Sequence, residues 1–246
     1  MPRNKREFIN GEIYHVVLRI VDDNLLFKNK DDYYRGIFSI YEFNNDKLIE
    51  IRERRVERKR EKLLQTISPQ SDKIIDKRDK FVDILAFCFM PNHIHLLLKQ
   101  MKDNGITKFM SKVGTGYASY FNKKYERKGH VFQDKFKSVL IEDNNQLKIT
   151  FTYIHTNPIS IIEPKWKEIG IKDPERVIKF LEQEYKWSSY PDYLENKNFP
   201  SVTEREFMTE IMEGKQGFRD FIENWVMFKK ELNESELNKS KDLFLG

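Results

Sequence analysis

The chain has 246 residues, a formal net charge of +5 and a single cysteine, Cys88. One cysteine excludes a disulfide framework within the chain, and no apolar run approaches the roughly 18 residues that span a bilayer. We therefore expect a cytoplasmic protein with no membrane partner. The excess of positive charge is equally consistent with an anionic partner such as nucleic acid and with an ordinary lysine-rich surface.

The first third of the chain alternates between core-like and highly charged segments. Residues 12–22 are β-branched and aromatic and predict a buried strand, and residues 31–44 have apolar side chains at helical spacing. Residues 49–80 then carry seven bases between Arg52 and Lys62, interspersed with glutamates. This charged excursion is either a solvated helix or a basic arm that contacts phosphates.

The middle of the chain predicts a hairpin followed by two helices and a strand. The apolar segments 81–90 and 93–100 flank a two-residue turn, Pro91-Asn92, and we expect this hairpin at the centre of the sheet. The remaining elements are predicted at 106–128, 136–141 and 144–158. This order is typical of an antiparallel sheet with helices, the α+β class, and from about residue 161 the chain reads as a helical extension.

Two histidines, His93 and His95, lie one residue apart in the second strand of the hairpin. Side chains alternate along a strand, so both imidazoles lie on one face while Ile94 and Leu96 face the core. Two imidazoles at this spacing can ligate one divalent ion, and an apolar strand has little structural need for a buried pair. The alternative is a pair of hydrogen-bonded core histidines.

A second pair of polar residues lies on the helix predicted at 144–158. Tyr153 and Asn157 are four residues apart and share one face of that helix. Asn157 offers an amide oxygen as a third metal ligand, and Tyr153 offers a phenolic oxygen as a nucleophile. On the residues alone, a tyrosine at the rim of the helix and an asparagine that caps it before Pro158 explain the pattern better than a catalytic role does.

The sequence resembles the HUH single-tyrosine transposases, in particular the branch of REP-associated tyrosine transposases. The segments that carry the resemblance are YHVVLR, MPNHIHLLL, RKGHVFQDKFKSVLI, YIHTNPI and WSSY, in this order. Together they cover roughly residues 8–190.

This resemblance implies a ferredoxin-like antiparallel sheet flanked by helices in residues 1–160, with 49–80 as an addition and 161–246 as a helical C-terminal extension. It further implies a transposase that cleaves and rejoins single-stranded DNA through a 5′-phosphotyrosine intermediate. Tyr153 would be the nucleophile, and His93, His95 and Asn157 would hold Mg²⁺ or Mn²⁺. Imidazole ligands favour manganese on ligand hardness, so we expect it to bind more tightly.

The expected partner is single-stranded DNA that forms hairpins, in a bacterial-type cytoplasm at the nucleoid. Basic, polar and aromatic side chains that could contact this DNA are concentrated in one segment: Arg127, Lys128, His130, Phe132, Gln133, Lys135 and Lys137. The alternative is that the aromatic rings of this segment belong to the core and that its basic side chains are merely solvated. The sequence leaves open a monomer or a homodimer, and with it whether Tyr153 acts within its own subunit.

Two other functions remain as alternatives. One is a non-catalytic, domesticated nucleic-acid-binding protein on the same fold, and the other is a metallohydrolase that attacks with water and needs no tyrosine.

Overall fold

The computed structural model describes residues 7–67, 76 and 78–244. Its strands are β1 (Ile13–Arg19), β2 (Val82–Met90), β3 (His93–Gln100) and β4 (Lys137–Ile141). Its longer helices are α1 (Lys30–Glu42), α2 (Ile51–Ile67), α3 (Gly105–Lys124), α4 (Asn144–Thr156) and α10 (Gly214–Phe244). Its short helices are η1 (Val21–Asp23), α5 (Ile159–Ile162), α6 (Trp166–Ile169), α7 (Pro174–Lys179), η2 (Phe180–Glu184), α8 (Tyr190–Tyr193) and α9 (Glu206–Ile211).

The four strands form one antiparallel sheet in the order β2-β3-β1-β4. With α1 before β2 and α3 before β4, this is the βαββαβ arrangement of a ferredoxin-like fold, so the predicted α+β class is confirmed. One detail of the prediction is wrong. The hairpin does not occupy the centre of the sheet, because β1 inserts between β3 and β4 and leaves β2 outermost.

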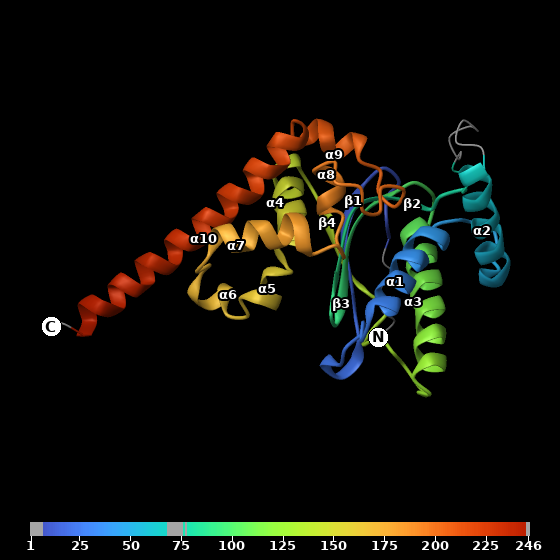
Figure 1. The fold of residues 1–246 in the computed structure, drawn as a ribbon, viewed down its shortest axis with the longest axis horizontal. Helices are drawn as coiled ribbons and strands as arrows, with labels where there is room; N and C mark the ends of the chain where they lie inside the picture. The colour runs from blue at the N-terminus through green and yellow to red at the C-terminus, as the bar shows by residue number, and fades with distance from the viewer. Residues whose placement is uncertain (1–6, 68–75, 77, 245–246) are drawn as a thin grey trace.

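One face of the sheet is covered by α1 and α3, which lie on the same side of the strands in Figure 1. Ile94, Leu96 and Leu98 of β3 point into this core, as the alternation of the strand predicts. The helices come close together at Gly116, where an added Cβ would lie 2.3 Å from the ring of Phe43. A larger residue there would require the Phe43 ring to shift, so glycine permits the close contact between α3 and the residue that caps α1.

The other face of the sheet is covered by α4 and the C-terminal helices, on the opposite side in Figure 1. Leu147, Phe151 and Ile154 of α4 pack with Leu97 of β3 and with buried residues of the C-terminal region such as Phe218. Among the described helices, none has the length and apolar character that crossing a bilayer requires.

The segment after η2 covers part of the outer edge of β2. The backbone N–H of Phe89 donates to the Trp187 carbonyl over 2.9 Å, and that of Ser189 donates to the Phe87 carbonyl over 3.0 Å. An unpaired edge strand invites pairing with other chains, and these contacts occupy its hydrogen-bonding groups. The residues WSSY thus join the C-terminal helices to the sheet.

The charged excursion contains a helix, α2, over its first part. Two arginines of α2 form ion pairs with the buried Glu42 of α1. Arg54 Nε lies 3.0 Å from Glu42 Oε2, and Arg58 Nε lies 2.7 Å from Glu42 Oε1. These two guanidinium groups neutralise a buried carboxylate, which gives them a structural role. Residues 68–75 and 77 of the excursion lie outside the described residues.

Candidate functional site

His93 and His95 open strand β3 and project from the face that α4 covers. Their Nε2 atoms lie 2.9 Å apart, and the two rings are nearly perpendicular, at 80°. The His95 side chain is buried, with 3% of its surface exposed. The period of two in the strand thus brings both imidazoles to one point, at the end of the sheet where β3 follows the hairpin turn.

This spacing suits joint ligation of a divalent ion. Two nitrogens at about 2.1 Å from one ion lie about 3 Å apart when their bonds are perpendicular. Among the described residues, no group of three or more His, Cys, Asp or Glu side chains is arranged to hold a metal. Any ion held here would therefore take its remaining ligands from an amide, from water or from a substrate.

The environment keeps both imidazoles in the neutral form that can ligate a metal. Burial, together with the positive charges of Arg19 and Lys167, lowers the pKa of His93 to about 4. Burial also holds the pKa of His95 well below its ordinary value, with smaller contributions from neighbouring His93 and His15.

Tyr153 faces these histidines from α4. That helix begins at the cap Asp143, whose Oδ1 accepts from the Gln146 N–H over 2.7 Å, and its apolar stripe fixes its rotation on the sheet. The Tyr153 ring centroid lies 5.6 Å from that of His95, and 37% of its side chain is exposed. The phenol and the imidazoles belong to the same chain.

The competing tyrosines of α3 lie on the far side of the sheet. Tyr117 is buried, and its hydroxyl donates to the Leu26 carbonyl over 2.9 Å. The hydroxyls of Tyr120 and Tyr125 both bond to the carboxylate of Asp32, over 2.8 Å and 2.6 Å. Tyr153 is the tyrosine, among the described residues, whose ring packs against His95 and His15.

Asn157 is buried at the C-terminal end of α4, but its amide turns back on its own helix. Its Nδ2 donates to the Tyr153 carbonyl over 2.6 Å, and among the described residues no hydrogen bond links it to His93 or His95. The structure therefore unites three of the four predicted site residues and leaves Asn157 one turn away, with its amide oxygen not engaged in that bond.

His155 has a structural position between α4 and the C-terminal region. It is fully buried, its Nδ1–H donates to the Phe151 carbonyl over 2.9 Å, and its Nε2 accepts from Ser189 Oγ over 2.8 Å. This contact ties the helix that carries Tyr153 to the WSSY segment at the β2 edge.

Arg19 and Lys167 act electrostatically on the histidine pair, and a third cation, Lys137, lies two strands away from β3. Arg19 of β1 is the cross-strand neighbour of His93. Lys137 of β4 is the cross-strand neighbour of Val17 in β1, and Val17 is in turn the neighbour of His95 in β3. Lys167 of α6 places its Nζ 5.8 Å from the Tyr153 ring. Sequence reasoning missed Lys167, because nothing in the motif spacing predicts that α6 folds back to this site.

Four of the predicted DNA-contacting residues line one groove between α3 and the segment after it. They are His130, Phe132, Gln133 and Lys135, and they face the small residues of α3. The segment turns at Gly129, whose φ of +91° favours glycine, and the Gln133 N–H donates to the Arg19 carbonyl over 3.0 Å. The groove is thereby anchored at the end of β1 that lies beside His93.

The other three predicted contacts lie outside this groove. Lys128 is exposed, Arg127 lies over the Phe121 ring at 5.6 Å from its centroid, and Lys137 belongs to β4. Phe136, the second ring of the segment, is buried in the core, as the alternative interpretation expects for it.

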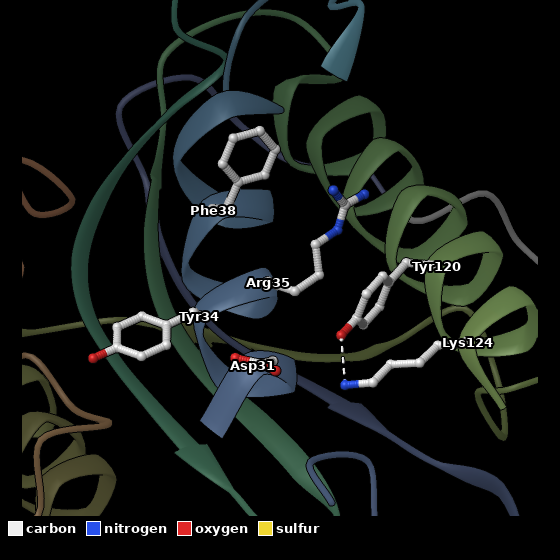
Figure 2. A pocket seen from close by; sticks show the side chains of 6 residues that line it. All are labelled: Asp31, Tyr34, Arg35, Phe38, Tyr120 and Lys124. Atoms are coloured by element: carbon white, nitrogen blue, oxygen red, sulfur yellow. Dashed lines mark hydrogen bonds between the residues drawn. The ribbon is translucent and has the colours of Figure 1, made fainter. Parts of the chain in front are cut away.

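A separate hollow lies between α1 and α3, and Figure 2 shows its lining. Tyr34 and Arg35 come from α1, and Tyr120 and Lys124 come from α3, with Lys124 Nζ 3.0 Å from the Tyr120 hydroxyl. Both helices cover the face of the sheet opposite the histidines, so this hollow is not part of the site.

A ferredoxin-like sheet that presents a His–hydrophobic–His pair to a tyrosine on a later helix is the arrangement of the HUH class. Residues 47–157 match a family of transposases described as "Transposase IS200 like", and the matched segment contains His93, His95, Tyr153 and Asn157. The resemblance to the HUH single-tyrosine transposases is thus confirmed over residues 47–157, the segment that matches the IS200-like transposase family.

Among solved structures, the chain is similar to one described as "Structure of the REP associates tyrosine transposase bound to a REP hairpin". The similarity covers 84% of this chain and 96% of that chain, at 14% sequence identity and a TM-score of 0.46. No curated protein sequence matches the chain significantly.

Proposed function

We propose that this protein is a metal-dependent endonuclease and strand transferase for single-stranded DNA, acting through a covalent bond to Tyr153 in DNA transposition. The observation that carries the proposal is the contact between half-exposed Tyr153 and His95, whose ring centroids lie 5.6 Å apart, beside the converging Nε2 atoms of His93 and His95. A buried tyrosine would serve packing alone, whereas this phenol is open to a substrate.

His93 and His95 would hold a divalent ion, Mg²⁺ or Mn²⁺, with Asn157 as a third ligand once its amide turns from the Tyr153 carbonyl. When bound, the ion supplies Lewis-acid neutralisation of the charge on the scissile phosphate. We expect Mn²⁺ to bind more tightly because imidazole is a softer ligand than carboxylate or water.

Tyr153 would attack the scissile phosphorus through its phenolic oxygen. A phosphorus–oxygen bond forms to Tyr153 while the bond to the 3′ oxygen breaks, and the phenolic proton is transferred to the departing 3′ hydroxyl. The product is a 5′-phosphotyrosine and a free 3′ end. Because the phosphodiester is exchanged rather than hydrolysed, a later hydroxyl can reverse the reaction and join strands.

The surrounding cations and the groove would hold the DNA. Arg19, Lys137 and Lys167 place positive charge around the point where the phosphate must lie, which favours an anionic substrate over a neutral one. The groove of His130, Phe132, Gln133 and Lys135 lies on the α3 side of the sheet and is anchored at the end of β1 beside His93, so a DNA strand would pass around this end of the sheet. Its ring and its polar groups suit unpaired bases and backbone phosphates.

One chain would suffice for cleavage, because α4 packs on the sheet that carries the histidines it faces. We regard residues 1–160 as the catalytic domain and 161–246 as an extension that supports α4, in part through His155 and Ser189.

A covalent-adduct assay tests the proposal. The protein is incubated with a 3′-labelled single-stranded DNA hairpin and Mn²⁺, denatured, and examined for label that migrates with the protein. We expect an adduct for the wild type and none for Tyr153→Phe, which keeps the ring and removes the nucleophile. Tyr34→Phe is the matched control, since Tyr34 is also exposed but lies on α1.

Each alternative function gives a different result in this assay. DNA binding without cleavage would indicate a non-catalytic binding protein, and cleavage that survives Tyr153→Phe would indicate attack by water. Either result contradicts the proposal.

A further inference from the structure

Each histidine of the pair uses its second ring nitrogen in a hydrogen bond to another side chain. His93 Nδ1 lies 2.6 Å from Asn92 Oδ1, and His95 Nδ1 lies 2.9 Å from His15 Nε2. Neither contact can be predicted from the His–hydrophobic–His spacing of residues 93–95. Asn92 forms the hairpin turn, and His15 comes from a strand 80 residues away in the sequence.

These contacts bear on which ring nitrogen carries the proton. A neutral imidazole has one N–H and one lone pair, so a nitrogen that ligates a metal requires the proton on the other nitrogen. The Nε2 atoms of His93 and His95 converge to 2.9 Å, which requires Nδ1–H on both rings if both ligate. Each Nδ1–H then needs an acceptor, because an unpaired buried donor is costly.

For His93 the acceptor is a carbonyl oxygen. Asn92 Oδ1 has lone pairs and no proton, so a bond to it fixes the His93 proton on Nδ1 and leaves Nε2 free. The geometry of the turn supplies this acceptor, since Asn92 directly precedes His93 where β3 begins.

For His95 the acceptor is a third imidazole. The His15 and His95 rings are nearly coplanar, at 18°, with centroids 5.1 Å apart and the two bonded nitrogens 2.9 Å apart. Ring lone pairs and N–H bonds lie in the ring plane, so this is the arrangement of an in-plane hydrogen bond. If His15 accepts at Nε2, its own proton is on Nδ1 and His95 Nε2 is free to ligate.

We infer that His15, together with Asn92, is a positioning residue that sets the tautomers of the metal-ligating histidines. The inference rests on the metal site of the proposed function. Side chains that bond to the second nitrogen of a ligating histidine typically contribute tenfold to a hundredfold to metal affinity. The β1–β3 register brings His15 to this place, because it puts Val17 opposite His95 and His15 one step further along the same face.

The test measures Mn²⁺ affinity of the full chain by the electron paramagnetic resonance signal of the free ion, without DNA. We expect His15→Leu, which removes the acceptor, to weaken binding about tenfold to a hundredfold. His15→Gln can return an acceptor oxygen near the same position, and we expect it to recover most of the affinity. Val17→Ala is the matched control, since Val17 lies on the same face of β1, opposite His95, and neither valine nor alanine carries a hydrogen-bonding side chain.

A second measurement reads the tautomers directly and does not depend on the variants folding. Long-range ¹H–¹⁵N spectra of the wild type with Mg²⁺ bound distinguish a protonated Nδ1 from a protonated Nε2. We expect Nδ1–H in His15, His93 and His95. A His15 protonated at Nε2 contradicts the inference, because such a ring would be a donor toward His95 and not an acceptor.

His95→Ala separates this inference from the proposed function. If the wild type does not bind Mn²⁺, or if His95→Ala binds it as well as the wild type does, the metal site of the proposed function is wrong. The inference about His15 is then wrong as well. If His95→Ala abolishes binding while His15→Leu binds as the wild type does, the metal site stands and the role of His15 alone is wrong.

Discussion

The two faces of the sheet are built from the same strands, yet one is closed by packing and the other carries the proposed site. On the face covered by α1 and α3, the inward positions are apolar, such as Leu18, Leu96 and Phe109, all nearly inaccessible to solvent. On the face covered by α4, the apolar packing ends at His93 and His95, beside the half-exposed Tyr153.

The difference shows how a strand can serve stability and function at once. Alternation assigns Ile94 to one core and its two neighbours to the site, so each residue of β3 has one environment only. The Nδ1 atoms of His93 and His95 are hydrogen-bonded to Asn92 and His15, which limits the cost of burying these rings. Stability and chemistry should therefore respond separately to substitutions on the two faces.

The largest effect is expected from His95→Ala, on the functional face. Loss of a ligating imidazole should remove several kcal/mol of charge stabilisation at the phosphate, so adduct formation should fall at least about 1,000-fold. The measurement is the rate of covalent adduct formation on a labelled hairpin. If each chain uses its own tyrosine and histidines, as proposed, mixing this variant with Tyr153→Phe should not restore activity; restoration would indicate exchange of α4 between subunits.

On the opposite face, Phe109→Ala should lower the free energy of unfolding by about 3–5 kcal/mol, because it empties a fully buried ring site in α3. Chemical denaturation measures the loss. Phe228→Ala, at an exposed ring of α10, should change it little. Mn²⁺ affinity of the folded Phe109→Ala protein should equal that of the wild type; a matching loss would show that the two faces are coupled.

A third prediction concerns His155, the buried link between α4 and the C-terminal region. Burial lowers its pKa to about 3 in the folded protein, from about 6.5 in the unfolded chain. Between these values the unfolded chain binds more protons, so stability falls as the pH drops, by about 1.4 kcal/mol per pH unit. In denaturation measured from pH 6 to pH 4, His155→Gln should reduce that slope by this amount.

The matched control for this prediction is His130→Gln, at an exposed ring on the segment that lines the groove. It should retain the wild-type slope. An unchanged slope in His155→Gln would mean that His155 titrates alike in both states, contrary to its burial.

The smallest effect is expected from Lys167→Gln, which removes an exposed charge beside Tyr153. Since exposed charges are well screened, affinity for single-stranded DNA should fall only about threefold to tenfold, and the difference should shrink at high salt. Fluorescence anisotropy at several salt concentrations measures it. Lys215→Gln, which removes a lysine paired with Glu195 at the start of α10, should have less effect at every salt concentration.

Several features of the site follow from local spacing and were predictable. The convergence of His93 and His95 needs only the period of a strand, and the exposure of Tyr153 beside a buried stripe needs only the period of a helix. The ligand role of Asn157 is still a prediction, because its amide bonds to the Tyr153 carbonyl in this structure.

By itself, the sequence determined the order of strands and helices, the shared face of the two histidines and the apolar stripe of α4, because each depends on periodicities within one segment. Tertiary structure alone decided that β1 lies between β3 and β4, that His15 meets His95, and that Lys167 returns to the site. These contacts join segments distant in sequence, and their geometry is set by strand register and helix docking, which no local pattern encodes.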